Sequence, residues 1–476
     1  MLDVQLGELV SAAPAGVDEA LALVAGFDEA LTYGLARLGE DRAQALNALA
    51  GALAGTPIGE RSAEAVAKVA AGPVSDEHLA ALAGGRAALF GAVHDALLDR
   101  LDAALGRTRA GLERAGADQG AGGAVRAGLE RAEVGQDAGL LAGCRAWLRE
   151  LAITGWRGVD HDLVSSADQT IEALLAEPAL RGLAVLLDGL AAELRASSPV
   201  ATMDRVPARR WADLWTRAML LAQRGPWREA AEEVSGRLLI LGADVHEHAT
   251  AVRVQVHAVL EPSGGGQARL VRTSVAAAKV DTIVGPTVWR LFGGHPTLLA
   301  ALAEHRSLEI TGMPLLPGGD LIWHDDKARA GDEADPLAVA RLQLPVAMAA
   351  AVTPLDRHPV RIAEPVFVEG YKSDGGSLTL GEHVIAFDLD RLPSCGPLTP
   401  ALLKASTACV GLLRWDAGRW TLQPLGVQAT VKKQPVAAHI GDWAQGPTDP
   451  KVVKAQAKSG DVVAVLRERA GRLLRK

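Results

Sequence analysis

The sequence contains few cysteines and no long apolar stretch. Its three cysteines, Cys144, Cys395 and Cys409, are an odd number without CxxC spacing, which excludes a disulfide framework and a cysteine-rich zinc module and fits a reducing cytosol. The longest uncharged apolar run, between Arg341 and Asp356, is too short for a transmembrane helix. The acidic N-terminus is unlike a signal peptide. We therefore expect a soluble, cytoplasmic protein with no membrane association.

Aromatic residues are also scarce, at 4% of the chain, so the core must be built mainly from alanine, leucine and valine. The 49% hydrophobic and 22% charged residues are close to ordinary globular usage, and 476 residues exceed what one core usually serves. Roughly two or three domains are therefore expected. The formal net charge of −8 argues against a protein that coats nucleic acid or an anionic membrane.

The first half of the chain has a helical pattern. Apolar residues recur at three- and four-residue spacing from Leu21 to Leu35. Ser75 is a predicted N-cap of a long helix that runs to Leu105. Glycine-rich residues 116–123 are a candidate linker. Further helices are expected over residues 140–156, 163–175, 180–194 and 208–223.

The pattern changes to strands after Pro226. Residues 252–257 alternate strictly between apolar and polar side chains, which predicts a strand with two different faces. Other expected strands are residues 237–242, 269–274, 307–310, 360–368, 377–380 and 383–388. The sequence thus predicts an α+β fold with a helical domain over 1–225 and a mainly antiparallel β-rich domain over 226–438. Residues 439–476 are expected to form a linker and a basic C-terminal helix.

A β-hairpin is predicted over residues 410–423, with Asp416 to Gly418 as a three-residue loop. That register places Trp415 opposite Arg419 and Arg414 opposite Trp420. Each pair would stack a cation over a ring, contributing about 0.5–1 kcal/mol if exposed. These four residues are a candidate partner-binding element, although tryptophan in such positions is more often half-buried sheet packing.

Asp244, His246 and His248 form the most specific candidate metal site. Histidines two residues apart on a strand point to the same side, and a nearby carboxylate adds a ligand for zinc or iron. A third protein ligand is not identified by spacing. The simpler interpretation, which we favour, is a polar turn with solvated histidines.

The remaining polar clusters favour structural interpretations. His324 with Asp325, Asp326 and the acids up to Asp335 is interpreted as a surface loop, and Asp160 as a helix cap. Residues 372–377 are interpreted as a β-turn. The sequence contains neither a G-x-S-x-G nucleophile elbow nor a phosphate-binding loop ending in Lys-Ser/Thr.

Four segments carry a resemblance to a known family. These are residues 210–222, 235–242, 268–273 and 291–296. Their order resembles the region that follows the zinc finger in bacterial, mostly actinobacterial, SWIM zinc-finger family proteins. The zinc ligands of that finger are absent, so zinc and nucleic-acid binding do not carry over. The resemblance implies a companion of a MoxR-type AAA+ ATPase and a von Willebrand factor A protein.

We therefore expect a non-enzymatic adaptor or scaffold that binds other proteins and needs no cofactor. One alternative is a metal-dependent hydrolase using Asp244, His246 and His248. Another is a nucleic-acid-binding factor acting through the last 45 residues, which hold ten basic and four acidic residues. Because a solvated amphipathic helix has the same composition, we do not expect nucleic-acid binding.

Overall fold

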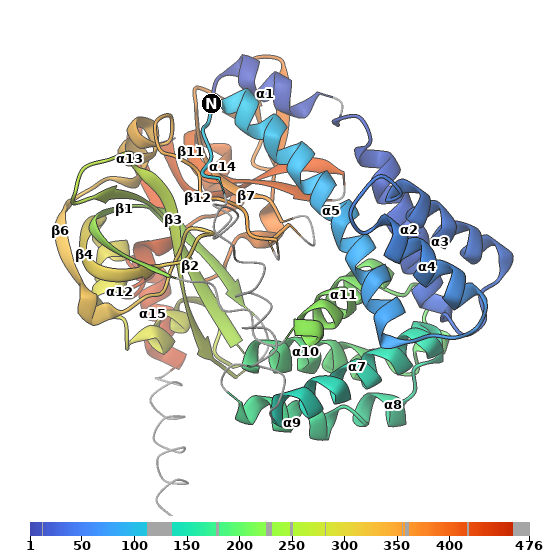
Figure 1. The fold of residues 1–476 in the computed structure, drawn as a ribbon. Helices are drawn as coiled ribbons and strands as arrows, with labels where there is room; N and C mark the ends of the chain where they lie inside the picture. Colours follow the sequence, from blue (N-terminus) through green and yellow to red (C-terminus); the bar gives the residue numbers. More distant parts are fainter. Residues whose placement is uncertain are drawn as a thin grey trace, which may run out of the picture.

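The protein has an α+β fold, with helices in the first half of the chain and two mainly antiparallel sheets in the second half (Figure 1). The computed structural model describes residues 1–11, 13–111, 136–177, 180–224, 231–247, 251–280, 282–354, 356–357, 361–416 and 418–459. The predicted linker at 116–123 and residues 460–476, where the basic C-terminal helix is predicted, lie outside these residues. The last helix of the first half ends at Arg224, and the first strand begins at Glu232.

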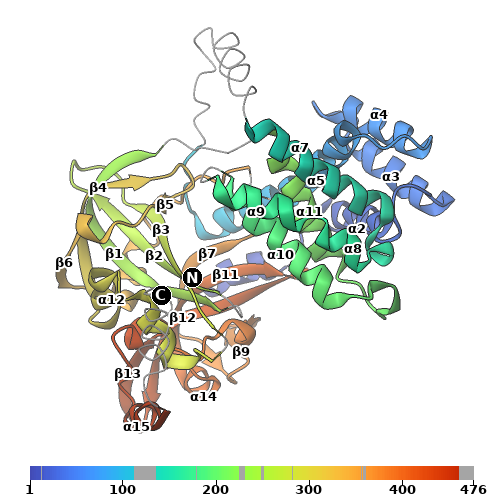
Figure 2. The ribbon, with the colours of Figure 1, turned by 90° about the horizontal axis from the view of Figure 1, so that it is seen from below.

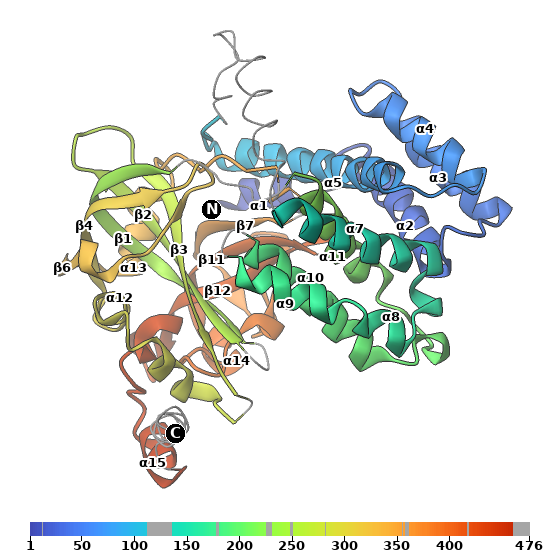
Figure 3. The ribbon, with the colours of Figure 1, turned by 60° about the horizontal axis from the view of Figure 1, so that its bottom comes forward.

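The helices of the first half gather on one side of the two sheets (Figures 2 and 3). They are α1 (Asp3–Val10), α2 (Val17–Tyr33), α3 (Glu40–Ala52), α4 (Gly59–Ala70), α5 (Asp76–Leu105), α7 (Gln136–Thr154), η1 (Trp156–Gly158), α8 (His161–Ser165), α9 (Asp168–Ala176), α10 (Arg181–Ser197), η2 (Val200–Thr202) and α11 (Ala208–Arg224). The predicted caps are confirmed: Ser75 accepts from the backbone of His78 at the start of α5, and Asp160 accepts from Leu163 at the start of α8.

Several of the few aromatic residues pack in the core of the helical part. Trp156 and Trp211 meet edge to face at 5.9 Å, and Phe27 lies 6.3 Å from Trp215. All four are fully buried among alanine and leucine side chains. Burying such large rings supplies apolar area that an alanine-rich chain otherwise lacks.

Helix α5 joins the helical part to the sheets. Its first half packs in the helical core, where the fully buried Arg86 contacts Asp28 at 2.6 Å and Asp213 at 2.7 Å. Its second half, from Val93 to Leu101, belongs to the core of the sheets together with α1. Figure 1 shows α5 running from α4 and α11 to α1. Because one helix serves both cores, the two halves of the protein are held in contact.

The first sheet closes on itself, because β1 pairs with both β2 and β4. Its strands are β1 (Glu232–Glu247), β2 (Ala251–Pro262), β3 (Arg269–Ala278), β4 (Arg306–Leu315), β5 (Asp320–Leu321) and β6 (Ala328–Glu333). The helices accompanying it are η3 (Gly285–Phe292), α12 (Pro296–Ala303), η4 (Asp325–Lys327) and α13 (Pro336–Gln343). The predicted strands at 237–242, 252–257, 269–274 and 307–310 all lie within these bounds.

The second sheet has the order β7-β11-β12-β10-β9-β8, and β13 pairs with β12. Its strands are β7 (Ala363–Glu369), β8 (Lys372–Ser373), β9 (Ser377–Leu380), β10 (His383–Phe387), β11 (Ser406–Asp416), β12 (Arg419–Val431) and β13 (Gln434–His439). Its helices are η5 (Leu389–Arg391), α14 (Pro400–Lys404), η6 (Ile440–Trp443) and α15 (Pro450–Ser459). Ile440 and Trp443 are buried in the core of the sheets, so the chain just after residue 439 is part of that core.

The two sheets meet where β1 crosses β12. A Cβ atom on Gly242 would lie 2.7 Å from Cβ of Leu425, closer than real Cβ contacts come. Glycine at this position lets the backbone of one sheet approach the other. The irregular register between Ile240 and Gly242 falls at the same point of β1.

The hairpin is confirmed as β11 and β12, but its predicted register is wrong by one residue. Asp416 pairs with Arg419 and Trp415 with Trp420, so the tryptophans face each other at 5.3 Å. Arg414 lies opposite Thr421. The predicted pairs of Arg414 with Trp420 and of Trp415 with Arg419 are therefore not formed. A shift of one residue moves each side chain to the other face, and the observed register buries Trp420.

The interpretation of residues 323–335 as a loop was also wrong in part. The segment contains η4 and the strand β6, which pairs with β4. Its acids serve the backbone: Asp325 accepts from the amides of Thr297 and Leu298 at the start of α12, and Asp335 caps α13. Helix capping therefore accounts for Asp325 and Asp335. Among the described helices none is long and apolar enough to cross a membrane.

Candidate functional site

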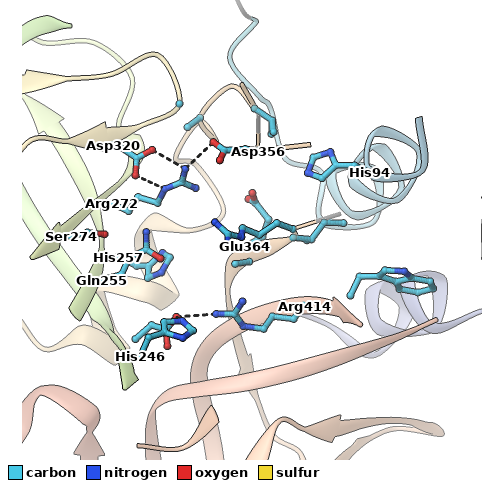
Figure 4. Close-up of a pocket in the computed structure, with 18 of the residues that line it drawn as sticks. His94, His246, Gln255, His257, Arg272, Ser274, Asp320, Asp356, Glu364 and Arg414 are labelled. Atoms are coloured by element: carbon cyan, nitrogen blue, oxygen red, sulfur yellow. Dashed lines mark hydrogen bonds and ion pairs between the residues drawn. The ribbon is translucent and has the colours of Figure 1, made fainter. Parts of the chain in front are cut away.

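A polar cavity of about 390 Å³ lies between the first sheet, the second sheet and α5 (Figure 4). Titratable side chains from several elements meet there, although they lie far apart in the sequence. The charged and histidine residues that line it are His94, Arg109, Asp244, His246, Arg253, His257, Arg272, Asp320, Asp356, Arg361, Glu364, Asp388, Arg391, Arg414 and Asp416.

One wall of the cavity is the polar face of β1, β2 and β3. Asp244 pairs with Gln255, which in turn pairs with Ser274, and all three line the cavity. His246 pairs with Arg253 in the same way. Side chains alternate along a strand, so the intervening valines 252, 254 and 256 are buried on the apolar side of the same sheet. In the alternation predicted for residues 252–257, the apolar side chains therefore face the core and the polar side chains face a cavity.

Asp244 connects this wall to the second sheet. Its carboxylate accepts from Nη2 of Arg414 at 2.9 Å, from Nε2 of Gln423 at 2.7 Å, and contacts Nε2 of His246 at 2.8 Å. Burial alone would raise the pKa of Asp244, but His246, Arg414 and Gln423 together hold it well below its usual value. The carboxylate is thus ionised and fully engaged.

Arg414 supplies the positive charge that compensates the carboxylate of Asp244. Its Nε donates to Oε1 of Gln423 at 2.6 Å, which orients the guanidinium toward Asp244. Burial lowers the pKa of Arg414 to about 10, so the side chain stays charged at neutral pH. The two groups therefore neutralise each other inside the cavity wall.

Four further carboxylates of the cavity are also paired with arginine. Arg272 binds Asp320 through two hydrogen bonds of 2.7 and 2.8 Å and reaches Asp356 at 3.4 Å (Figure 4). The same kind of contact joins Glu364 to Arg109 at 3.2 Å. Asp388 contacts Arg391 at 3.0 Å, and Arg107 adds a second contact to Glu364 at 3.0 Å.

The pKa of Glu364 reflects its contacts with two arginines. Burial alone would raise its pKa, but Arg109 and Arg107 hold the pKa of Glu364 below its usual value. Arg109 is itself fixed by two hydrogen bonds to Asp102 at the end of α5, at 2.7 and 3.0 Å. The carboxylate is thereby bound to two cations on the helical side of the cavity.

Arg253 and Arg361 differ from the other arginines of the cavity. Neither makes a hydrogen bond or an ion pair with any residue in the described part of the chain. Burial, followed by repulsion from Arg361, lowers the pKa of Arg253. Burial and the charge of Arg361 also lower the pKa of Arg217 on α11. Positive charge therefore accumulates at this end of the cavity, where the helical part meets the sheets.

Two of the cavity histidines, His257 and His94, are held in the neutral form. Burial lowers the pKa of His257 to about 3, and its Nε2 has no hydrogen-bond partner among the described residues. Burial also lowers the pKa of His94, and a 3.3 Å contact with Asp95 opposes this effect only in part. Neutral imidazole can donate or accept a single hydrogen bond to a ligand at either nitrogen.

A second cavity, of about 610 Å³, shares Asp244, His246, Asp388 and Arg391 with the first. It continues past η5 along residues 389–394, where the side chains are mostly exposed or half-buried. The shared residues mean that the polar wall of β1 borders both spaces.

The structure brings together two of the candidate groups that the sequence had suggested separately. Asp244 and His246 of the metal candidate meet Arg414 of the hairpin candidate in one hydrogen-bonded network. His248 lies outside the described residues. Trp420 is buried and Arg419 is exposed, so the four hairpin residues do not form one surface.

The cysteines do not contribute to this site. Burial raises the pKa of Cys144 to about 11 and that of Cys395 to about 12, and it raises the pKa of Cys409 as well. All three thiols are buried. They are therefore protonated at neutral pH and poor nucleophiles.

Comparison of the chain with known protein families, with characterised proteins and with solved structures finds no significant match. Inference about function therefore starts from the geometry of the cavity. The residues of the cavity could not be identified from the sequence, because Arg253, Arg361 and Glu364 belong to no local motif. The alternation at 252–257 was a signal for a polar sheet face, but nothing in it shows what that face meets.

Proposed function

We propose that this protein binds a small anionic ligand in the cavity between its two sheets and its helical part. Arg253 and Arg361 are the principal contacts. The observation that carries the proposal is that these two arginines line the cavity without an ion-pair partner in the part of the chain that the structure describes. Each of five carboxylates beside them already contacts another arginine.

Electrostatics supports an anion over a neutral ligand. Arg253 is half-buried and Arg361 is exposed, so removing Arg253 in part from water beside a second cation is costly. An anion bound between Arg253 and Arg361 would remove their mutual repulsion, which already lowers the pKa of Arg253. Guanidinium groups match carboxylate and phosphate oxygens through paired hydrogen bonds.

The size of the cavity supports a small molecule. A volume of about 390 Å³ lies at the lower end of the range of about 300–1,000 Å³ that is typical for small-molecule sites. The lining is mainly polar, with Gln255, Ser274 and His257 as uncharged hydrogen-bonding groups beside the arginines. We infer a compact ligand with one or two carboxylate or phosphate groups and further hydrogen-bonding groups.

The adaptor role, with a MoxR-type ATPase and a von Willebrand factor A protein as partners, stays a prediction. Binding of a small ligand at the junction of both halves is compatible with it, since α5 would transmit a change between the cores. The hydrolase alternative also stays a prediction. Asp244 would have to give up its contact with Arg414 to become a metal ligand.

Isothermal titration calorimetry with four probes tests the proposal: sodium phosphate, pyrophosphate, succinate and citrate, each at constant ionic strength. We expect one phosphate or carboxylate probe to bind with a Kd below about 1 mM. The double variant Arg253→Gln/Arg361→Gln should bind that probe at least tenfold more weakly. Comparing the phosphate with the carboxylate probes identifies the class of anion.

A matched control removes two exposed arginines elsewhere, in the double variant Arg205→Gln/Arg329→Gln. It changes the net charge by the same amount, so it should bind the probe as the unmodified protein does. If no probe binds below 10 mM, or if the cavity variant and the control lose affinity equally, the proposal is wrong.

A further inference from the structure

We infer that His305, His439 and Asp442 form a binding site for a divalent transition metal ion of the zinc type. The three residues lie at the junction of α12, β13 and η6, and none of them lines the polar cavity. One ligand atom from each lies within 4.8 Å of the other two. Two imidazoles and one carboxylate are a common ligand set for zinc and for iron(II).

The distances fit a tetrahedral metal ion after a small adjustment. Two ligand atoms at about 2.0–2.1 Å from zinc lie roughly 3.3 Å apart when the angle is tetrahedral. Nδ1 of His439 lies 3.6 Å from Oδ1 of Asp442, which is close to that separation. Nε2 of His305 lies 2.7 Å from the same oxygen and must move away by about 0.6 Å.

His439 supplies an independent reason to expect a ligand. Its side chain is 3% exposed, and neither ring nitrogen has a hydrogen-bond partner among the described residues. A buried polar atom without a partner costs about 1–3 kcal/mol. The ring is held firmly, because a Cβ on Gly426 would lie 2.1 Å from Cδ2 of His439. A metal ion at Nδ1 would give one of the two nitrogens a partner without moving the ring.

The other two ligands are oriented by the backbone around them. Oδ2 of Asp442 accepts from the amide of His439 at 2.9 Å, which leaves Oδ1 directed at the imidazoles. His305 has a φ of 49°, a left-handed conformation that histidine and asparagine adopt more often than most residues other than glycine. The ring of His305 meets that of His439 edge to face at 4.7 Å.

The site is open on one side. The side chains of His305 and Asp442 are 32% and 19% exposed, while His439 forms the buried base. Three protein ligands with access from solvent leave a coordination position for water or a substrate, as in catalytic rather than structural zinc sites. The proposed zinc site of His305, His439 and Asp442 shares no residue with the polar cavity, which contains Asp244 and His246.

Zinc titration of the full-length protein, after treatment with a chelator, tests the inference. We expect about one equivalent of zinc to remain after desalting, with a Kd below about 10 µM. His305→Asn and Asp442→Asn should each weaken binding at least tenfold. Asparagine tolerates the left-handed conformation at 305 and keeps an acceptor for the amide of His439 at 442.

Two controls separate this site from other histidines. His324→Gln removes an exposed histidine, and His246→Gln removes the histidine beside Asp244. Both should retain zinc with unchanged affinity, and cobalt(II) should give visible absorption bands with the unmodified protein but not with His305→Asn. The inference is wrong if the unmodified protein binds no zinc below 100 µM. It is equally wrong if His246→Gln loses zinc while His305→Asn, shown to be folded by circular dichroism, retains it.

Discussion

Asp244 on β1 and Arg414 on β11 form an ion pair of 2.9 Å that links the two sheets of this protein. The Asp244 side chain is 1% exposed and that of Arg414 is 12% exposed. Gln423 binds both partners, so each charge is compensated by a cation–anion contact and by a neutral hydrogen bond. Both residues line the polar cavity.

Removing either member of this pair should strongly destabilise the protein. Asp244→Ala leaves Arg414 buried without its partner, and Arg414→Ala does the same to Asp244, so each should lower the free energy of unfolding by about 3–5 kcal/mol. The double variant should lose less than the sum, because no unpaired charge remains. Urea unfolding of the four proteins measures this coupling.

The control is an exposed ion pair of similar length. Arg195 contacts Asp168 at 2.9 Å, and the two side chains are 39% and 58% exposed. Arg195→Ala should cost at most about 1 kcal/mol, since exposed pairs contribute little. Additive losses in the Asp244 and Arg414 cycle would show that the two sheets are not joined by this pair.

His257 should make stability depend on pH. Its pKa is about 3 in the folded protein and 6.5 when the ring is fully solvated, so the unfolded chain binds the extra proton between these values. The contribution is fully present above pH 6.5 and is lost as the pH falls. It amounts to about 2 kcal/mol between pH 7.5 and pH 5.

Urea unfolding of the protein and of His257→Gln at both pH values tests this expectation. Glutamine does not titrate, so the loss of stability between pH 7.5 and pH 5 should be smaller in the variant by about 2 kcal/mol. The same pH dependence in both proteins would mean that His257 is protonated in the folded state.

Gly242→Ala should push the two sheets apart. The added Cβ would lie 2.7 Å from Leu425, so the core must shift, at a cost of about 1–3 kcal/mol. Gly266→Ala is the matched control, because this glycine also has a positive φ and a Cβ there meets nothing within 4 Å. Thermal unfolding of both variants gives the comparison, and equal melting temperatures would contradict the close approach of β1 and β12.

Much of the fold could be predicted from the sequence because its signals are local. Three- and four-residue spacing predicted the helices, and the cap residues Ser75 and Asp160 act as expected. The hairpin of β11 and β12 was recognised, but its register was not. The sequence from Asp416 to Gly418 is compatible with either a two-residue or a three-residue hairpin loop. The observed register is the one that buries Trp420, and this depends on tertiary packing.

The candidate site could not be predicted in the same way. Arg253, Arg361 and Glu364 come from β2, from the segment before β7 and from β7 itself, and no local spacing relates them. Whether an arginine is paired depends on which distant carboxylates reach it. For Asp244 the sequence suggested a metal ligand, whereas the arginine that binds it in the fold is Arg414, 170 residues away.

The most direct test of the anion cavity is a crystal structure of the protein grown with the probe that binds most tightly. The account predicts electron density for one anion within hydrogen-bonding distance of the guanidinium groups of Arg253 and Arg361. Clear density for that anion elsewhere on the protein, with both side chains turned away from the cavity, would contradict it.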